Sequence, residues 1–247
     1  MLRKRWPIFI MLLLTVLLVS GSVIRAESVW DGMSLGLEKE IGYLNHETIL
    51  ATKEQVQLPA GQNERLEAVF NRLVAATQRK NELKYNLTVV EDPAVNAFSL
   101  PGGYVFVNTG LLDFTRNDDE LAGVLAHELA HVECRHSMKA ILRSVGMTAV
   151  VAALGTGGAN SFNHEAITRM AGFSILLLQL GYSRDAEYQA DKLGVHIMRQ
   201  AGFSKDRYLA FWHRDQRLEG AGKNGQFFEF FSTHPATSDR IKRIESM

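Results

Sequence analysis

The sequence predicts an α+β fold that is mainly α-helical, with a small β-sheet, behind an N-terminal targeting segment. Three observations support this class. Apolar side chains recur every three or four residues in several segments, two short segments between residues 85 and 108 have the composition of strands, and helix-capping residues precede two long helical segments. With 247 residues, 46% of them hydrophobic and 22% charged, the chain is long enough to form one compact core.

The first 26 residues have the pattern of an export signal. Basic side chains within residues 1–5 are followed by an apolar run over about residues 8–19 and then by small residues. We expect either cleavage after Ala26 or retention as a single N-terminal anchor. Residues 27–247 then form one domain, which we expect to be exported, to the periplasm if the source is bacterial.

The charge balance argues against nucleic acid as a partner. The whole chain has 27 basic and 27 acidic side chains, and residues 1–26 hold four basic and no acidic ones. Without them, 23 basic against 27 acidic side chains remain, a net charge of −4. Binding to phosphate backbones requires a basic excess. Cys134 is the only cysteine in the sequence, which excludes an intramolecular disulfide and a cysteine-based metal site.

The segment up to residue 112 combines helices with the expected strands. Short helices are expected around residues 35–45, followed by a turn over residues 58–61. A helix begins near Asn63, because the apolar side chains that follow it have helical spacing. Residues 85–89 alternate apolar and polar side chains as a half-buried strand does, and residues 96–112 read as a strand, a Pro-Gly-Gly turn and another strand.

Two capping signals define the long helices of the second half. Asn117 with Glu120 forms a capping box that opens a helix running to His136. Ser183 caps a helix that ends at the Ala201-Gly202 pair.

Two apolar stretches, residues 145–154 and 170–180, lie between these helices. Each is shorter than the roughly 20 residues that a membrane-spanning helix needs, so we expect a buried helical hairpin. Contact of this 145–180 hairpin with a membrane is the alternative.

The predicted helix from Asn117 contains an HExxH motif, made by His127, Glu128 and His131. Histidines four residues apart lie on one helix face and can hold one zinc ion, with the glutamate beside the attacking water. A solvated helix with incidental histidines is the alternative. The apolar residues around the motif indicate a buried helix, and buried imidazole and carboxylate groups need a partner.

Zinc requires a further protein ligand, for which the second capped helix offers two carboxylates. Glu187 and Asp191 are four residues apart in RDAEYQAD. Glu187 can bind the metal, while Asp191 can accept a hydrogen bond from the second ring nitrogen of a ligand histidine. Two carboxylates on a solvated helix face are the alternative interpretation.

Several segments together resemble a known family. HELAHVECRH followed by SRDAEYQAD, with NAFSLPGGYVFVNTGLL upstream and STHPATSDRI downstream, is similar to the zinc metallopeptidase family that contains HtpX, the CAAX prenyl protease and BepA. The resemblance covers about residues 61–247, and the chain looks like a soluble, exported, single-domain member. It implies a zincin-type, mainly helical fold with a small sheet whose edge strand lies beside the HExxH helix.

The resemblance also implies the roles of the metal site. One Zn²⁺ per chain is bound by His127, His131 and Glu187, and Glu128 is the general base. His234, in the Thr-His-Pro segment, either donates a hydrogen bond to the oxyanion as a catalytic residue or occupies the fourth zinc position at rest. Arg240 either stabilises the same negative charge or pairs with a carboxylate.

The substrate is expected to bind along a strand. Tyr104 begins the segment YVFVN, which could pair with an extended peptide and place its scissile bond over the metal. Asn96 and Gly103 would shape this edge, although an ordinary β-hairpin would contain the same residues.

These features predict a zinc-dependent metalloendopeptidase in which Glu128 assists the attack of water on a peptide bond. Its expected partners are unfolded or misassembled proteins, in quality control of envelope proteins, and its N-terminus or the 145–180 hairpin is a possible membrane contact. Two alternatives are a protease-like chaperone or binding protein that keeps the metal site but rarely cleaves, and a protein with a purely structural zinc ion.

Overall fold

The structure is a computed structural model that describes residues 35–143, 164–220, 234 and 238–247. The predicted targeting segment, residues 1–26, and the first apolar stretch, residues 145–154, lie outside the described residues.

The described chain contains helices and one three-stranded sheet, which confirms the predicted mainly helical α+β class. The strands are β1 (Asn86–Val90), β2 (Ala97–Leu100) and β3 (Tyr104–Asn108), with a short 3-10 helix at Pro101–Gly103. The helices are those over residues 35–50 and 136–143, α2 (Ala60–Ala75), α3 (Thr109–Phe114), α4 (Asp118–Glu133), α6 (His164–Leu180), α7 (Arg184–Gln200), α8 (Lys205–Gly220) and α10 (Ser238–Ser246).

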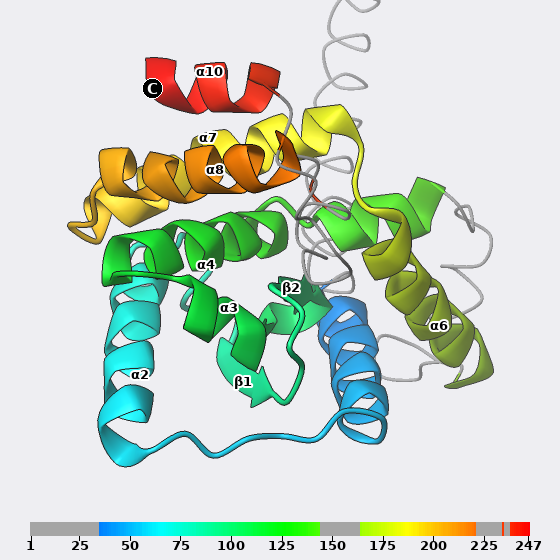
Figure 1. The fold of residues 1–247 in the computed structure, drawn as a ribbon. Coiled ribbons are helices and arrows are strands. Elements are labelled where there is room, and N and C mark those ends of the chain that lie inside the picture. Colours follow the sequence, from blue (N-terminus) through cyan, green and yellow to red (C-terminus); the bar gives the residue numbers. More distant parts are fainter. Residues whose placement is uncertain (1–34, 144–163, 221–233, 235–237) are drawn as a thin grey trace, which may run out of the picture.

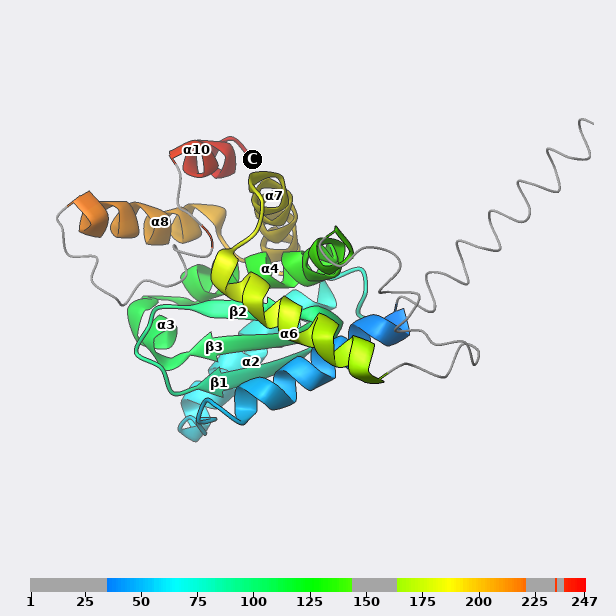
Figure 2. The ribbon, with the colours of Figure 1, turned by 90° about the vertical axis from the view of Figure 1, so that its right-hand side faces the viewer.

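Helix α4 lies at the centre of the layers. In Figure 1, α7, α8 and α10 lie on one side of α4, and the sheet lies on the other. Figure 2 shows β2 as the strand closest to α4 and β1 as the farthest. The main hydrophobic core joins α4 to α2, α7, α8 and the sheet through fully buried residues such as Val105, Leu125 and Trp212.

The strand order is β1-β3-β2, which corrects the predicted role of the segment that begins at Tyr104. β3 pairs with β1 in parallel and with β2 in antiparallel orientation, so both of its hydrogen-bonding sides are used within the sheet. A substrate cannot pair with β3. The edge beside α4 belongs to β2, because the chain returns through the Pro-Gly-Gly turn to insert β3 between the other strands.

Helix starts follow local chemistry. α2 begins at Ala60, directly after Pro59, so the predicted turn over residues 58–61 is in fact the start of a helix. A fixed proline φ, here −50°, is compatible with the residue that precedes a helix. At α4 the predicted cap is confirmed, since the Asn117 side chain accepts a hydrogen bond from the Glu120 N–H at 3.0 Å. The Glu120 side chain accepts a hydrogen bond at 2.9 Å from the N–H of Arg116, one residue before the cap, and not from Asn117 as a capping box requires.

Helix α4 ends earlier than predicted. It stops at Glu133, and Arg135 adopts a left-handed conformation with φ of 54° before a new helix starts at His136. The predicted helix running continuously to His136 is therefore wrong. The sequence around the break contains no glycine or proline that would have indicated it.

The second apolar stretch belongs to α6, which packs against the helices over residues 35–50 and 136–143 through Ile167, Met170 and Ala171. Its Leu176 side chain is 44% exposed. Within the described parts of the chain, the structure contains no helix that is both long and apolar enough to cross a membrane.

Candidate metal centre

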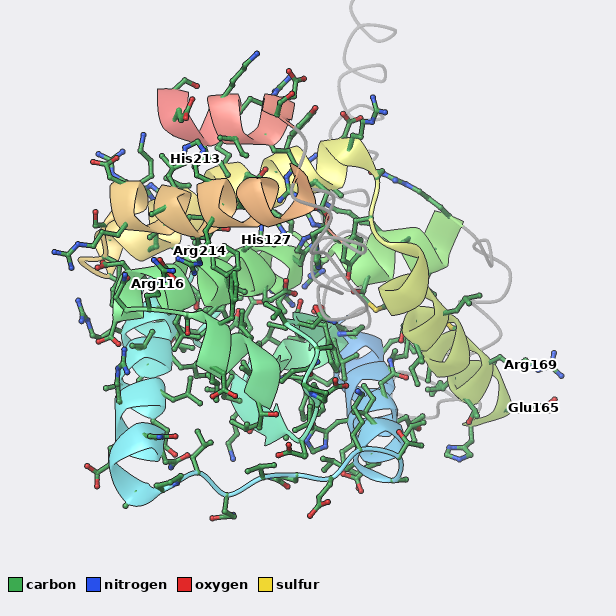
Figure 3. The ribbon with its side chains drawn as sticks, viewed as in Figure 1. Arg116, His127, Glu165, Arg169, His213 and Arg214 are labelled. Carbon is green, nitrogen blue, oxygen red and sulfur yellow. The ribbon has the colours of Figure 1, made fainter. Side chains whose placement is uncertain are left out.

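Helix α4 carries the HExxH side chains into the interior. His127, Glu128 and His131 are each only 1% exposed, and Figure 3 shows His127 within the helical layer, far from the peripheral Glu165 and Arg169 of α6. Apolar neighbours on α4 such as Val124 and Leu125 are fully buried, so the whole helix is enclosed. The prediction of a buried rather than solvated motif helix is confirmed.

Helix α7 brings two carboxylates against α4. Ser183 caps α7 by accepting a hydrogen bond from the Ala186 N–H at 3.3 Å, and Glu187 and Asp191 are each 3% exposed. The two helices approach closely at Gly194, where a Cβ atom would lie 3.1 Å from the Cα of His127. The small residue allows the α7 carboxylates to reach the α4 histidines.

Four side chains converge on one point: His127, His131, Glu187 and His234, with one potential ligand atom from each within 4.8 Å of the others. His127 Nε2 lies 3.0 Å from His131 Nε2 and 3.3 Å from His234 Nδ1. Glu187 Oε1 lies 3.5 Å from His131 Nε2 and 3.0 Å from His234 Nδ1, and Glu187 Oε2 lies 3.4 Å from His127 Nε2.

These spacings fit a tetrahedral metal ion. Ligands about 2.0–2.1 Å from a tetrahedral centre are separated from one another by about 3.3 Å. Imidazole nitrogens that present lone pairs to each other repel unless a cation lies between them. The chemistry of the donor set, nitrogen with carboxylate oxygen, is also that of catalytic zinc sites.

A second layer holds the carboxylates in place. Asp191 lies 3.2 Å from His127 Nδ1, and Arg240 donates two hydrogen bonds to Asp191 at 2.7 and 2.8 Å. Arg240 also lies 2.9 Å from Glu187 and donates to the carbonyl of His234 at 3.0 Å. Its side chain is 2% exposed, so of the two predicted alternatives the structure places Arg240 in a carboxylate pair.

Glu128 lies beside the four ligand groups. Its Oε2 accepts a hydrogen bond from Ser99 Oγ at 3.0 Å, and its Oε1 lies 3.4 Å from His234 Nε2. Ser99 belongs to β2, so the edge strand and the motif helix meet at this carboxylate. Sequence reasoning missed Ser99, because its contact depends on the strand order.

His136 is a second residue that the sequence did not reveal. Its Nδ1 lies 2.9 Å from His131 Nδ1, and the side chain is 5% exposed. On a continuous helix a residue five positions later would point about 140° away from His131. The break at Arg135 brings it back to the ligand. Tyr182 also stacks on His131, with ring centroids 4.2 Å apart.

The buried imidazole and carboxylate groups of the cluster shift one another's pKa values. Burial raises the pKa of Glu187, but the charge of His234 and hydrogen bonds from His127 and His234 outweigh it and hold this pKa well below its usual range. Burial lowers the pKa of His127, while hydrogen bonds to Asp191 and Glu187 raise it, with a net value of about 9. Burial lowers the pKa of His131 strongly, which leaves this imidazole neutral.

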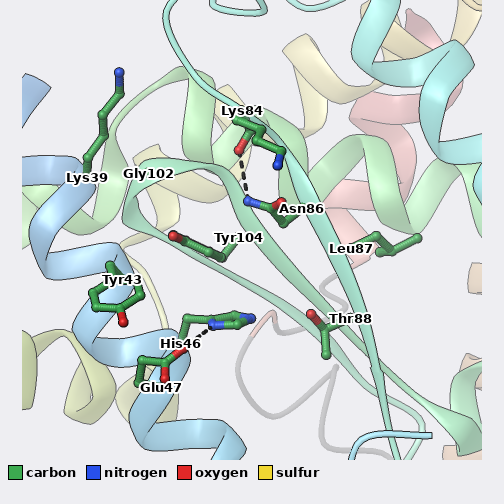
Figure 4. Close-up of a pocket in the computed structure, with 10 residues that line it drawn as sticks. All are labelled: Lys39, Tyr43, His46, Glu47, Lys84, Asn86, Leu87, Thr88, Gly102 and Tyr104. Carbon is green, nitrogen blue, oxygen red and sulfur yellow. Dashed lines mark hydrogen bonds and ion pairs between the residues drawn. The ribbon is translucent and has the colours of Figure 1, made fainter. Parts of the chain in front are cut away.

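The other predicted substrate residues are not at this cluster. Tyr104 faces an open groove of about 530 Å³ together with Tyr43 and His46, on the sheet face that the helix over residues 35–50 covers (Figure 4). Gly103 approaches the carbonyl of Lys84 in the turn. Asn96 is 7% exposed and its carbonyl accepts a hydrogen bond from the Asn108 N–H, which fixes the start of β2.

Comparison with known proteins places the chain in a peptidase class. The model of Peptidase family M48 matches residues 60–247. The chain therefore belongs to peptidase family M48, and the predicted metallopeptidase family is confirmed.

Individual relatives with similar sequences are also named as metallopeptidases. The chain is 34% identical over 220 residues to mitochondrial metalloendopeptidase OMA1 of Schizosaccharomyces pombe, covering 87% of this chain and 62% of the relative. It is 32% identical to the OMA1 of Saccharomyces cerevisiae, covering 89% and 66%, and 30% identical to metalloprotease YcaL of Escherichia coli, covering 66% and 62%. The chain thus spans less than two thirds of the length of these relatives.

The relatives correct the predicted location. The N-terminal pattern predicts export to a bacterial periplasm, but relatives from both yeasts, Arabidopsis thaliana and Bos taurus are named as mitochondrial proteins. A basic stretch before an apolar run is typical of an export signal, but this pattern alone does not establish the compartment of the protein. The prediction of a periplasmic protein is therefore wrong.

Proposed function

We propose that the chain is a zinc-dependent endopeptidase that hydrolyses peptide bonds in unfolded or misassembled proteins. The observation that carries the proposal is the position of Glu128, a fully buried carboxylate that lies next to the four ligand groups without being one of them. Membership of peptidase family M48 supports the same activity.

The zinc ion, Glu128 and Ser99 have different roles in the proposed hydrolysis. When bound, a zinc ion supplies Lewis-acid chemistry, which polarises a carbonyl group and makes a neighbouring water more acidic. Glu128 takes a proton from the attacking water and delivers it to the leaving amine. Ser99 holds Oε2 of this carboxylate, so that Oε1 faces the reacting groups.

The substrate lies along β2 in this proposal. The Asn108 N–H donates to the Asn96 carbonyl, and the pairing of β2 with β3 is antiparallel. The N–H and carbonyl groups of Ala97 and Ser99 therefore point away from β3. An extended peptide that pairs with them would pass beside Glu128, and no chain end of the substrate is needed for this binding mode.

His234 fills the fourth position of the resting site in this proposal. Its Nδ1 is 3.3 Å from His127 Nε2 and 3.0 Å from Glu187, as expected of a ligand in the same tetrahedron. With His234 among its ligands, a bound zinc ion would have no open position for a substrate carbonyl group. We expect the chain to be latent until the substrate itself displaces His234.

Cleavage of an unfolded protein tests the proposed activity. The full chain, incubated with unfolded casein, is expected to produce fragments, to lose this activity with a chelator, and to regain it when zinc is added back. A chaperone-like protein would instead suppress aggregation of casein without producing fragments. No zinc-dependent fragments under any of these conditions would refute the proposal.

A structural metal site is the second candidate, because four protein ligands are typical of such sites. The zinc content of His234→Ala and of His131→Ala distinguishes a catalytic from a structural metal site. If His234 is a displaceable ligand, His234→Ala keeps one equivalent of zinc and a folded chain, whereas His131→Ala loses the metal. Equal loss of metal and fold in both variants would favour the structural site.

A further inference from the structure

The two histidines of the HExxH motif have different outer contacts. His127 Nδ1 faces a carboxylate, since it lies 3.2 Å from Asp191 Oδ1. His131 Nδ1 faces another imidazole instead, 2.9 Å from His136 Nδ1. The environment of His131 is therefore the unusual one.

The geometry fixes the direction of this hydrogen bond. His131 Nε2 points into the metal cluster, 3.0 Å from His127 Nε2 and 3.5 Å from Glu187. A ligand nitrogen must offer a lone pair, so the ring proton of His131 is on Nδ1. At 2.9 Å, His136 Nδ1 then accepts this proton in a hydrogen bond.

We propose that His136 is a positioning residue for the metal site: it accepts the Nδ1–H of His131 and so holds the ring with Nε2 directed at the metal. The inference rests on the proposed metal site but not on peptide hydrolysis. It assigns to His136 the part that Asp191 plays for His127, with a neutral acceptor in place of a charged one.

The chain around His136 is built to hold this contact. Arg135 takes the left-handed conformation that turns His136 back towards α4, and its Nε lies 3.3 Å from Glu38. The next residue, Ser137, is hydrogen-bonded to Tyr182 at 2.6 Å, and the Tyr182 ring stacks on His131. His131 is thus fixed on one ring face by Tyr182 and at one ring edge by His136.

Zinc affinity measured by competition with a chromophoric chelator tests the proposal. His136→Leu fills the space but cannot accept a hydrogen bond, and we expect it to bind zinc about 10–100-fold more weakly than the wild type. His136→Asn can place its amide oxygen near the position of Nδ1, and we expect its affinity to lie within about threefold of the wild type. His196→Leu, at an exposed histidine of α7, is the matched control and should leave the affinity unchanged.

A second readout concerns the proton itself. In the zinc-loaded wild type, nitrogen NMR of His131 should show a proton on Nδ1 that is protected from exchange, and this protection should fall in His136→Leu. Should His136→Leu fail to fold, as judged by circular dichroism, the comparison moves to His136→Asn and His136→Gln, whose amide oxygens reach different positions. Gln is then expected to bind zinc more weakly than Asn.

The outcomes separate the two proposals. If the wild type binds zinc and His136→Leu binds it with equal affinity, only the proposed role of His136 is overturned. Equal zinc affinities of His136→Asn and His136→Gln would have the same meaning if those two variants are the ones compared. A wild type that binds no zinc would overturn the proposed function and this inference together. Loss of casein cleavage without loss of zinc affinity would concern hydrolysis only.

Discussion

Buried polar side chains around α4 satisfy one another across different elements. Arg240 of α10 binds Asp191 of α7, which in turn faces His127 of α4. Removal of one partner from such a chain leaves an uncompensated buried charge, which costs more than the pair contributes. The positions of the candidate ligand groups therefore depend on residues outside the four-residue cluster.

At the residue scale, Ser99 offers a sharp test because it touches Glu128 and none of the metal-binding groups. Ser99→Ala removes the hydrogen bond to Oε2, and we expect kcat to fall about tenfold, the effect of losing about 1.5 kcal/mol from a hydrogen bond to a charged group. Zinc content and KM should not change. Ser246→Ala, at an exposed serine near the end of α10, is the control. An unchanged kcat in Ser99→Ala would show that Glu128 needs no such contact.

The role of a residue was predictable from the sequence where its partner lies on the same helix. The pairing of His127 with His131 follows from helical spacing. Glu187 was one of two candidate carboxylates, and its role as a ligand was implied by the family resemblance. The potential ligand atoms of all three residues lie close together in the structure. Ser99 and His136 were not predictable. The contact of Ser99 depends on which strand lies next to α4, and that of His136 on a helix break at Arg135 that has no glycine or proline signal.

At the element scale, the packing of α7 on α4 sets the distance between carboxylates and histidines. Gly194 lies at the closest approach, and a Cβ there would meet the backbone of His127 and Ala126 at 3.1–3.2 Å. The identity of a residue on α7 thus controls the geometry of a ligand on α4.

Gly194→Ala is expected to push the two helices apart. We expect a loss of about 1–3 kcal/mol in the free energy of unfolding, as for other overpacked contacts, together with weaker zinc binding. In the control, Gly172→Ala in α6, the added Cβ meets no atom of the described residues within 4 Å, so the variant should stabilise the chain by about 0.5–1 kcal/mol through helix propensity. Chemical denaturation and zinc competition measure both effects. Gly194→Ala with wild-type stability and affinity would contradict the close contact.

The starts of helices were predictable from the sequence, because capping residues and apolar periodicity are local signals. The starts of α4 and α7 at Asn117 and Ser183 agree with their capping residues. The order of the strands was not predictable, because pairing in a sheet is decided by contacts distant in sequence. The segment from Tyr104 was expected to bind substrate, but it is the central strand.

At the scale of the whole molecule, the candidate metal site joins elements from distant parts of the chain. His127 and Glu187 come from α4 and α7, and His234 lies between α8 and α10. An ion bound to these groups in the native state only must stabilise the fold by linkage, by about 4.1 kcal/mol when its concentration is a thousand times its Kd.

Removal of the metal is therefore expected to lower Tm. Calorimetry of the zinc-loaded chain, of the same chain after chelation, and of the chain after zinc is restored should give a high, a low and again a high Tm. His127→Ala should have a low Tm that does not respond to the chelator. Equal Tm values before and after complete removal of zinc would contradict a site that ties these elements together.

The central claim is that Glu128 performs proton transfer at a metal held by its neighbours. The most direct measurement compares kcat of zinc-loaded wild type and Glu128→Gln on an unfolded protein, with Asp118→Asn as an exposed carboxylate control on the same helix. We expect Glu128→Gln to bind one equivalent of zinc and to lose about 10²–10⁴-fold in kcat, while Asp118→Asn keeps the wild-type rate. A zinc-loaded Glu128→Gln that cleaves as fast as the wild type would contradict the account.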